Sequence, residues 1–294
     1  MPAAVQNEVP LSVVLAAVHE DPSFHEAIEL HERALAPIGG EVLVADGTEE
    51  GLAGIEPAVH MPGGDVFSLR AAAVVKARGQ IIALTEDHVV PEAGWHEEVL
   101  AAHERHPELA VGGVVLNGSR EKLIDRANFL MTFGTFLPPQ PLHHPHRVSP
   151  PANLSYKREV LGRYEIGQGT VEFDIGSDVF KAGEMVLDDH VRVAHVQSHG
   201  IRETHASHFH NGRTTTGLQP RPTALRARMR LALRRIKLPL WLVRSVTSET
   251  WNKPGYRRDL VTSLPFVATL AIAHSLGEAT GVLLGAGDSP GKME

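Results

Sequence analysis

Cysteine is absent from the 294-residue chain. Its absence excludes disulfide scaffolds, cysteine-ligated zinc, iron–sulfur clusters and thiol nucleophiles. Residues 1–10 also lack basic side chains ahead of an apolar run, so no signal peptide is predicted and we expect a cytoplasmic protein. The length is enough to bury one large core or two modest ones.

Basic residues are concentrated late in the chain, whose formal net charge is −7. Residues 221–258 contain eleven Lys or Arg and one acid, so this segment carries +10 and the remainder −17. The apolar residues 260–277 follow, with no formal charge over 18 positions. A basic segment next to an apolar one predicts a helix in the interface of an anionic membrane. A transmembrane span and a helical hairpin packed on protein remain alternatives.

No nucleic-acid-binding motif surrounds the basic segment, so we expect no nucleic-acid partner.

Short apolar runs alternate with helical spacing in the first part of the chain. The runs predict strands over residues 11–18, 41–45, 80–84, 109–116 and 191–196. The spacing predicts helices over residues 23–35, 67–77, 95–106, 172–183 and 222–247, the last interrupted near Pro239. This order predicts an α/β fold with a Rossmann-like, mainly parallel sheet flanked by helices, followed by a C-terminal helical extension.

Acidic side chains directly follow two of the predicted strands. Asp46 follows the second, and Glu86, Asp87 and His88 follow the third. Ligands of open α/β sheets bind at the carboxyl ends of the strands, so we expect these groups to line one crevice. Two carboxylates and an imidazole suit Mn²⁺ or Mg²⁺ better than structural zinc, although a solvated acidic turn is the alternative. His88 binds metal only when neutral, so binding is expected to weaken below about pH 6.5.

Five segments resemble, in order, the pattern of family 2 glycosyltransferases. Residues 77–95 (ARGQIIALTEDHVVPEAGW) resemble A-x-G-E-I-(I/V)-x-F-L-D-D-D-x-x-P-x-x-W. Residues 41–48 resemble an opening strand that ends V-D-D-G-S, and residues 151–161 resemble G-x-N-x-x-x-R-x-x-L. Residues 171–183 resemble E-D-x-D-L-x-x-R-L-x-x-A-G, and residues 192–195 the closing histidine segment. The resemblance covers roughly residues 11–213.

The resemblance implies a GT-A-like domain over residues 1–215, with residues 216–294 as the helical extension. It implies inverting transfer of a sugar from a nucleotide-sugar donor to a hydroxyl acceptor. Glu172 matches the general base, and Asn153 lies in the acceptor-side segment. Nucleotide-sugar binding is implied for Ala17, Glu20, Asp46, Arg70, Glu86, Asp87 and Arg213. Metal binding, with Mn²⁺ or Mg²⁺, is implied for Glu86, Asp87, His88 and His195.

Four departures from the pattern predict an atypical subgroup. The usual Pro-Thr-x-Asn is replaced by residues 16–19 (AAVH), and the usual Arg-Asn-x-Gly begins at Arg70 but continues with alanines. His88 replaces the last aspartate of D-x-D, and Val171 replaces the first acid of the E-D pair. The expected acceptor is an envelope or lipid-linked glycan, at the inner face of a membrane.

Two other functions remain possible from these residues. One is a nucleotide-sugar-binding protein of the same fold that has lost turnover, which the missing motif residues favour. The other is a nucleotidyltransferase, which needs a glycine-rich basic loop after the first strand. Residues 16–23 contain no glycine and only His19 as a basic side chain, which argues against the second.

Overall fold

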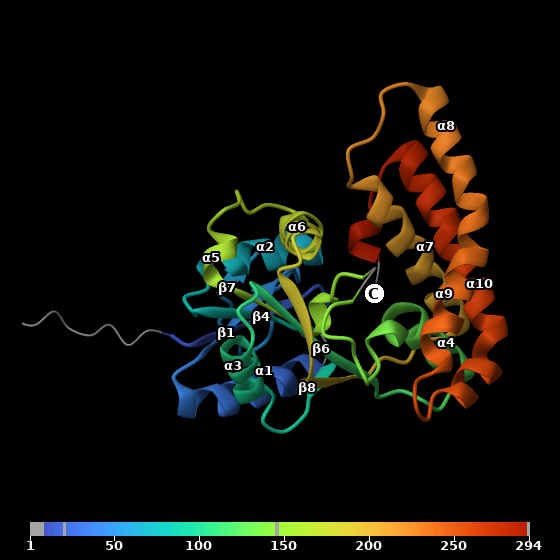
Figure 1. The fold of residues 1–294 in the computed structure, drawn as a ribbon. Coiled ribbons are helices and arrows are strands. Elements are labelled where there is room, and N and C mark those ends of the chain that lie inside the picture. The colour runs from blue at the N-terminus through green and yellow to red at the C-terminus, as the bar shows by residue number, and fades with distance from the viewer. Residues whose placement is uncertain (1–8, 20–21, 145–146, 293–294) are drawn as a thin grey trace, which may run out of the picture. The chain divides into compact units, whose positions relative to one another are not determined.

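The computed structural model describes residues 9–19, 22–144 and 147–292. The chain forms two compact units (Figure 1). The first unit comprises residues 1–115 and 140–194, and the second comprises residues 116–139 and 195–294. Each unit is thus built from two separate stretches of chain, whereas the division predicted from sequence lies after residue 215.

An eight-stranded sheet forms the centre of the first unit, in the order β3-β2-β1-β4-β7-β6-β8-β5. Its strands are β1 (Leu11–Ala17), β2 (Glu41–Asp46), β3 (Val59–His60), β4 (Ile81–Leu84), β5 (Val89–Pro91), β6 (Ala110–Asn117), β7 (Leu154–Lys157) and β8 (Met185–His195). The four strands β3, β2, β1 and β4 are parallel, and β7 runs antiparallel to both β4 and β6. The five predicted strands are confirmed, with different ends. The short strands β3, β5 and β7 were not predicted.

Helices cover both faces of this sheet, as predicted. They are α1 (Pro22–Leu35), α2 (Val66–Lys76), α3 (Trp95–Arg105), α5 (Arg158–Leu161) and α6 (Gly176–Lys181). Figure 1 shows α1 and α3 on one side of the sheet and α2 and α6 on the other. Helix α2 begins where the Asp65 carboxylate accepts hydrogen bonds from the backbone N–H groups of Phe67 and Ser68, as an N-cap residue does.

The register of the parallel strands places the two acidic turns at the same edge of the sheet. Ala17, the last residue of β1, pairs with Asp46 of β2, and Val14 of β1 pairs with Leu84 of β4. The chain therefore leaves β2 at Asp46 and leaves β4 just before Glu86 on the edge that usually binds ligands. Every residue of β1 and β4 is buried, so the apolar core holds the two strand ends that form this edge.

The predicted helix over residues 172–183 is present in a different form. A π-helical turn spans Thr170–Ile175, and α6 continues from Gly176. Gly169 begins the turn with φ of 76°, a value that glycine adopts without the steric cost that a Cβ brings. Single π-turns are frequent at functional sites, and this one carries Glu172. The segment 134–152 is largely a loop, with short 3₁₀ turns at Gly134–Phe136 and Pro151–Asn153.

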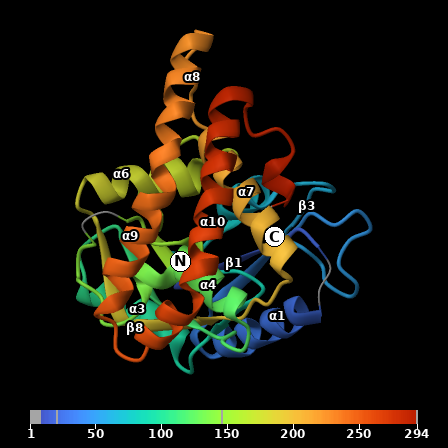
Figure 2. The same ribbon diagram turned by 90° about the vertical axis from the view of Figure 1, so that its right-hand side faces the viewer.

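Helices make up the second unit. They are α4 (Leu123–Phe133), α7 (Ile201–Gly217), α8 (Leu225–Arg234), α9 (Leu238–Trp251) and α10 (Arg257–Leu284). The predicted interruption of the basic helix is confirmed: a 3₁₀ turn at Arg235–Lys237 separates α8 from α9, and Pro239 lies in the first turn of α9, where proline is tolerated. Figure 2 shows α8 projecting beyond α7 and α10 within this unit.

Helix α10 contains most of the apolar stretch that follows the basic segment. Within the part of the chain that is described, it is the one helix long and apolar enough to cross a membrane, with mean hydropathy of 1.6 over 18 residues. It packs against α4, α7, α8 and α9. A Cβ on Gly277 would lie 2.0 Å from the carbonyl oxygen of Phe209, so only glycine allows this contact between α10 and α7.

Both ends of α10 also carry paired carboxylates. Asp259 lies 2.6 Å from a guanidinium nitrogen of Arg120. Glu278 lies 3.0 Å from Nε of Arg235 and 3.3 Å from Nε2 of His274. These ion pairs favour a helix packed on protein over an interfacial helix or a transmembrane span. A helix placed in lipid would lose its contacts with these charged partners.

Candidate active site

The acidic turn after β4 forms a compact cluster of its own side chains. His88 Nδ1 lies 2.6 Å from Asp87 Oδ1, and His88 Nε2 lies 3.3 Å from Glu86 Oε2. The backbone N–H of His88 also donates to Asp87 Oδ1, at 2.9 Å. Both nitrogens of the His88 imidazole therefore face a carboxylate, and the three predicted ligands are adjacent in space.

These carboxylates decide the charge of His88. Burial by itself lowers the pKa of His88, but the hydrogen bonds and charges of Asp87 and Glu86 outweigh burial and raise the pKa to about 10. His88 is thus an imidazolium at neutral pH, and its charge balances one of the two carboxylates. The two carboxylates that hold the proton on His88 therefore strengthen its competition with a metal ion, and the pH at which metal binding weakens stays a prediction.

Arg70 on α2 connects this cluster to Glu172 on the π-helical turn. Its Nη1 donates to Glu172 Oε1 at 2.9 Å, and its Nη2 donates to Glu86 Oε1 at 3.4 Å. The side chains of Arg70 and Glu172 are 3% and 6% exposed, whereas that of Glu86 is 23% exposed. One buried guanidinium therefore holds together two acids that lie 86 residues apart in the sequence.

Glu172 is a buried carboxyl group in a mixed environment. Burial raises its pKa above the ordinary value, and the charge and hydrogen bond of Arg70 offset that effect only in part. Its Oε2 atom is buried and has no hydrogen-bond partner among the described residues. A buried carboxylate oxygen without a donor is unusual in a folded protein and marks a place where a ligand's donor would fit.

The segment that carries Glu172 is fastened to the start of α2. Gln168 Nε2 donates to Asp65 Oδ2 at 2.7 Å, and the rings of Phe67 and Phe173 lie 5.2 Å apart. From the other side, the buried Tyr156 hydroxyl donates to the carbonyl of Val171 at 3.4 Å. These contacts fix the backbone on both sides of Glu172 and so fix the direction of its carboxylate.

Asp46 lies on the same edge of the sheet but is engaged locally. It is fully buried, and its carboxylate accepts hydrogen bonds from Thr48 N at 2.8 Å, Thr48 Oγ1 at 2.7 Å and Leu52 N at 2.9 Å. These bonds shape the loop after β2. A contact between Asp46 and the nucleoside stays a prediction, as does one for Ala17, which is buried at the end of β1. Glu20 lies outside the described residues.

Asn153 has a structural role that the sequence did not reveal. Its amide oxygen accepts from Trp95 Nε1 at 3.0 Å, and its Nδ2 donates to the carbonyls of Val114 and Val191 at 2.9 and 3.0 Å. The side chain is buried and ties β6 and β8 to α3. Its placement on the acceptor side stays a prediction.

His195 and Arg213 belong to the second unit. His195 is buried there, with its ring 4.4 Å from that of Phe133. Arg213 on α7 donates through Nε to the carbonyl of Gly285 at 3.0 Å. Metal binding by His195 and diphosphate binding by Arg213 stay predictions.

The donor set of the acidic turn fits a divalent cation. Glu86 Oε2 and His88 Nε2 are 3.3 Å apart. Adjacent ligands on an octahedral Mg²⁺ or Mn²⁺ lie at about 3 Å from each other when each bond is about 2.1 Å. Carboxylate oxygens and an imidazole nitrogen are ligands that these ions accept, provided that His88 first loses its proton.

Sequence reasoning missed the residues that position Glu172. Gln168, Asp65 and Tyr156 match no motif. A weak signal was available for Asp65, which directly precedes a helical pattern as an N-cap residue does. No local signal identifies Gln168 or Tyr156, because their contacts join distant parts of the chain.

Comparison with known proteins gives matches in structure alone. No family model matches the chain, and no curated protein matches it in sequence. Among solved structures, 123 chains match.

Glucosyl-3-phosphoglycerate synthase from Mycobacterium tuberculosis, solved with Mn²⁺ and UDP-glucose, is 17% identical with a TM-score of 0.45 over 67% of this chain and 74% of that one. The same enzyme with phosphoglyceric acid also bound is 14% identical, with a TM-score of 0.43 over 67% and 75%. GalNAc-T7 with UDP, GalNAc and Mn²⁺ is 15% identical, with a TM-score of 0.43 over 65% and 44%. Identities and TM-scores this low do not transfer an activity or a substrate to this chain.

Proposed function

We propose that this protein is a glycosyltransferase of the GT-A type, which moves a sugar from a nucleotide-sugar to a hydroxyl acceptor with inversion. The observation that carries the proposal is the buried Arg70, which contacts Glu172 on one side and Glu86 of the acidic turn on the other. A base for the acceptor and a cationic group for a departing diphosphate are thereby adjacent. Both are needed for sugar transfer from a nucleoside diphosphate.

Glu172 is the general base in this mechanism. The acceptor hydroxyl oxygen attacks the anomeric carbon while its proton passes to the Glu172 carboxylate. The new carbon–oxygen bond forms on one face of the sugar as the bond to the diphosphate oxygen breaks on the other, which inverts the anomeric centre. The electron pair of the broken bond leaves with the nucleoside diphosphate, and the proton on Glu172 is later released to solvent.

Charge that develops on the diphosphate requires a positive partner at the sheet edge. Arg70 supplies one fixed charge there at no cost in reorganisation. Glu86, Asp87 and His88 would hold Mn²⁺ or Mg²⁺, with His195 as a fourth predicted ligand. When bound, such a cation neutralises negative charge on the leaving diphosphate.

The remaining predicted contacts complete the proposal. Ala17, Glu20 and Asp46 contact the nucleoside end of the donor, Arg213 contacts the diphosphate, and Asn153 lies toward the acceptor. The transferred group is a hexosyl or similar sugar, and the acceptor is an envelope or lipid-linked glycan.

Donor binding provides the direct test. We expect UDP-, GDP- or dTDP-sugars with Mn²⁺ to raise the melting temperature of the full chain, since a ligand at 100 times its Kd stabilises the native state by about 2.7 kcal/mol. Glu86→Gln should lose the Mn²⁺-dependent part of this increase, and Glu97→Gln, an exposed acid on α3, should keep it. Stabilisation without release of nucleoside diphosphate would favour the binding protein without turnover. No stabilisation by any nucleotide-sugar would refute the glycosyltransferase proposal.

We further propose that the protein acts at an anionic membrane surface, which it reaches through α8 and the start of α9. None of the residues of α8 is buried within the structure. One exposed stripe is apolar and consists of Leu225, Met229, Leu233, Ile236 and Leu240. A second exposed stripe, one position further along the helix, is basic and consists of Arg226, Arg230, Arg234 and Lys237.

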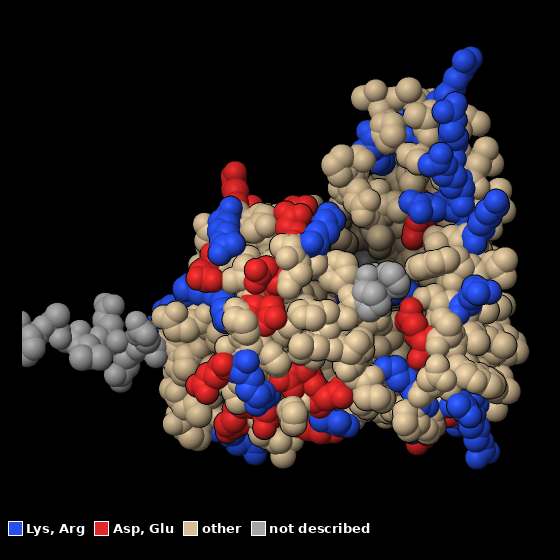
Figure 3. Space-filling model, viewed as in Figure 1, with Lys and Arg blue, Asp and Glu red and all other residues tan. Residues whose placement is uncertain are grey.

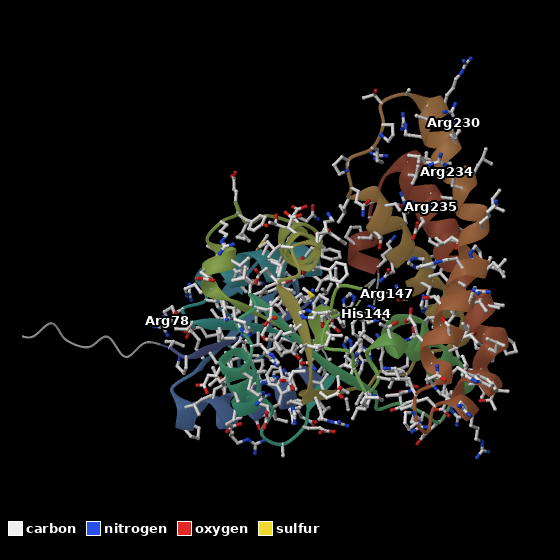
Figure 4. All side chains as sticks on the ribbon, viewed as in Figure 1. Arg78, His144, Arg147, Arg230, Arg234 and Arg235 are labelled. Atoms are coloured by element: carbon white, nitrogen blue, oxygen red, sulfur yellow. The ribbon has the colours of Figure 1, made fainter. Side chains whose placement is uncertain are left out.

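These two stripes lie side by side, because consecutive residues are 100° apart on a helix. Figure 3 shows the basic side chains along α8, and Figure 4 labels Arg230, Arg234 and Arg235. Residues 221–248 contain no acid. An apolar stripe beside a basic one is suited to the headgroup region of an anionic bilayer, with the apolar side chains toward the acyl chains. The proposal therefore assigns membrane contact to α8, not to the apolar segment 260–277 from which it was expected.

Flotation with phosphatidylserine vesicles tests this assignment. Each Lys or Arg near an anionic surface contributes about 1 kcal/mol, so Arg230→Glu with Arg234→Glu should lower vesicle binding at low salt by roughly 30-fold or more. Arg33→Glu with Arg163→Glu changes the net charge equally in the first unit and should leave binding nearly unchanged. Equal flotation of the two double variants would contradict membrane contact through α8.

A further inference from the structure

The ion pair between Arg70 and Glu172 restricts what the carboxylate is able to do. Arg70 occupies Glu172 Oε1 at 2.9 Å, and the two side chains are almost entirely buried. An ionised carboxylate in such a place is costly unless a charge or a hydrogen bond compensates it. Within the described chain, Arg70 is the group that donates to it through a side chain. Removal of that guanidinium would therefore favour the protonated acid, which is useless as a base.

The other oxygen of the carboxylate is left for a ligand. Glu172 Oε2 is buried and has no hydrogen-bond partner among the described residues. Because Oε1 belongs to Arg70, a proton delivered to Glu172 has to arrive at Oε2. The group that delivers it must be a neutral hydroxyl, since a carboxylate or a phosphate brings no proton and would be repelled.

We propose that Arg70 is a positioning residue for the base: its contact with Oε1 favours the ionised form of Glu172 and leaves Oε2 for a neutral hydroxyl of the acceptor. This inference rests on the proposed glycosyl transfer for the identity of the acceptor. It also assigns Arg70 a second role besides contact with the diphosphate, through its other arm toward Glu86.

The charged and titratable groups around Glu172 come from α2, from the residue that caps α2 and from β7. Arg70 on α2 is the cation and favours the ionised form. Asp65, which caps α2, acts in the opposite direction by its charge. Tyr156 on β7 is fully buried, and burial raises its pKa far above the ordinary value, so it stays a neutral phenol. Arg70 is thus the one positive charge among these groups that favours the ionised form of Glu172.

A carbon-13 NMR titration of Glu-labelled protein measures this role without any substrate. The signal of Glu172 is assigned by its loss in Glu172→Gln. We expect Arg70→Gln to shift the titration of Glu172 to higher pH, because burial is then no longer opposed by the guanidinium. Arg70→Lys keeps a positive charge but loses the two-armed geometry, so it should give a smaller shift in the same direction.

Arg78→Gln is the matched control. Arg78, labelled in Figure 4, forms an ion pair at 2.6 Å with Glu41 on the same unit, and its removal should leave the titration of Glu172 unchanged. Should Arg70→Gln fail to give the melting transition of the native protein, Arg70→Lys carries the test. A Glu172 titration that is the same in the Arg70 variants and in the native protein overturns the inference, whatever reaction the protein performs.

Hydrolysis of a nucleotide-sugar, with water as the hydroxyl acceptor, links the titration to chemistry. The acidic limb of the pH profile for kcat should move upward in Arg70→Lys together with the NMR titration. Turnover whose acidic limb stays in place in that variant contradicts the inference while the glycosyltransferase proposal survives. If the Arg70 variants shift the titration of Glu172 but the native protein turns over no nucleotide-sugar, the effect of Arg70 on Glu172 is supported and the proposed reaction is refuted.

Discussion

Glu172→Gln lowers kcat for sugar transfer by roughly 10²–10⁴-fold, the usual contribution of a general base. The amide has nearly the same size, and its oxygen still accepts the hydrogen bond that Arg70 donates to Oε1, so the local structure should be kept. What is lost is the ability to take the proton of the acceptor. Binding of the nucleotide-sugar should stay close to that of the native protein, because the base contacts the acceptor and not the diphosphate.

The measurement is kcat for transfer together with the Kd of the donor by calorimetry. Glu165→Gln is the matched control, because this exposed acid lies seven residues away in the same loop and should leave both values unchanged. A fall in donor affinity with normal kcat would assign Glu172 to the donor site. Normal turnover by Glu172→Gln would remove the residue from the mechanism altogether.

The first unit loses stability between pH 7 and pH 5.5. Burial lowers the pKa of His31 to about 3, of His96 to about 4 and of His103 to about 3. His31 Nδ1 and His96 Nε2 lie 2.8 Å apart, so protonation would also break their hydrogen bond. His103 Nε2 lies 2.8 Å from Ser155 Oγ in a similarly closed place.

The direction follows from the protons bound in each state. In the unfolded chain these side chains take up protons near pH 6.5, whereas in the folded chain they stay neutral down to about pH 4. The unfolded state therefore takes up three protons at these positions that the folded state does not, whereas His88, with its raised pKa, is already protonated in the folded state. Averaged over this range, the net difference among these four side chains is up to two protons, and the free energy of unfolding falls as the pH falls. Each proton of net difference contributes up to about 1.4 kcal/mol per pH unit, so a net difference of up to two protons removes roughly 2.5 kcal/mol between pH 7 and pH 5.5.

Urea denaturation at pH 7 and pH 5.5 measures this loss in a background with Trp241→Phe and Trp251→Phe, where the fluorescence comes from the buried Trp95 of the first unit. His103→Gln should reduce the pH dependence by about half, since it lowers the net difference from up to two protons to about one. His19→Gln, which replaces an exposed imidazole, should leave the pH dependence as it is. Equal stability at the two pH values would show that these side chains are not held neutral in the folded protein.

The sequence predicts the centre of the sheet well because the relevant signal is local. Strands β1, β2, β4 and β6 are each built around a short apolar run, and a strand buried on both faces is apolar along most of its length. Strands β3, β5 and β7 span only two to four residues, too few for a periodic pattern to emerge. Pro91 is compatible with β5, because this strand lies at the edge of the sheet.

In the candidate site, too, the features that depend on neighbouring residues were predicted and those that depend on distant residues were not. Glu86, Asp87 and His88 were predicted as neighbours because they follow a buried strand together, and the structure places them in contact. The pairing of Arg70 with Glu172 joins residues 102 positions apart, and no spacing rule relates them. Its consequence for the pKa of Glu172 depends on burial, which a sequence pattern does not give. The π-helical turn likewise depends on the contacts of Gln168 and Phe173 with α2.

The pairing of both ends of α10 affects when, during synthesis, the second unit is able to fold. Asp259 pairs with Arg120, 139 residues earlier, and Glu278 pairs with Arg235, 43 residues earlier, so the last long helix completes contacts with segments made before it. The first unit is fully synthesised once residue 194 has left the ribosome, whereas the second has to wait for residue 284. A nascent chain that stops before residue 257 would therefore present a finished sheet together with helices α4 and α7 that lack their covering partner.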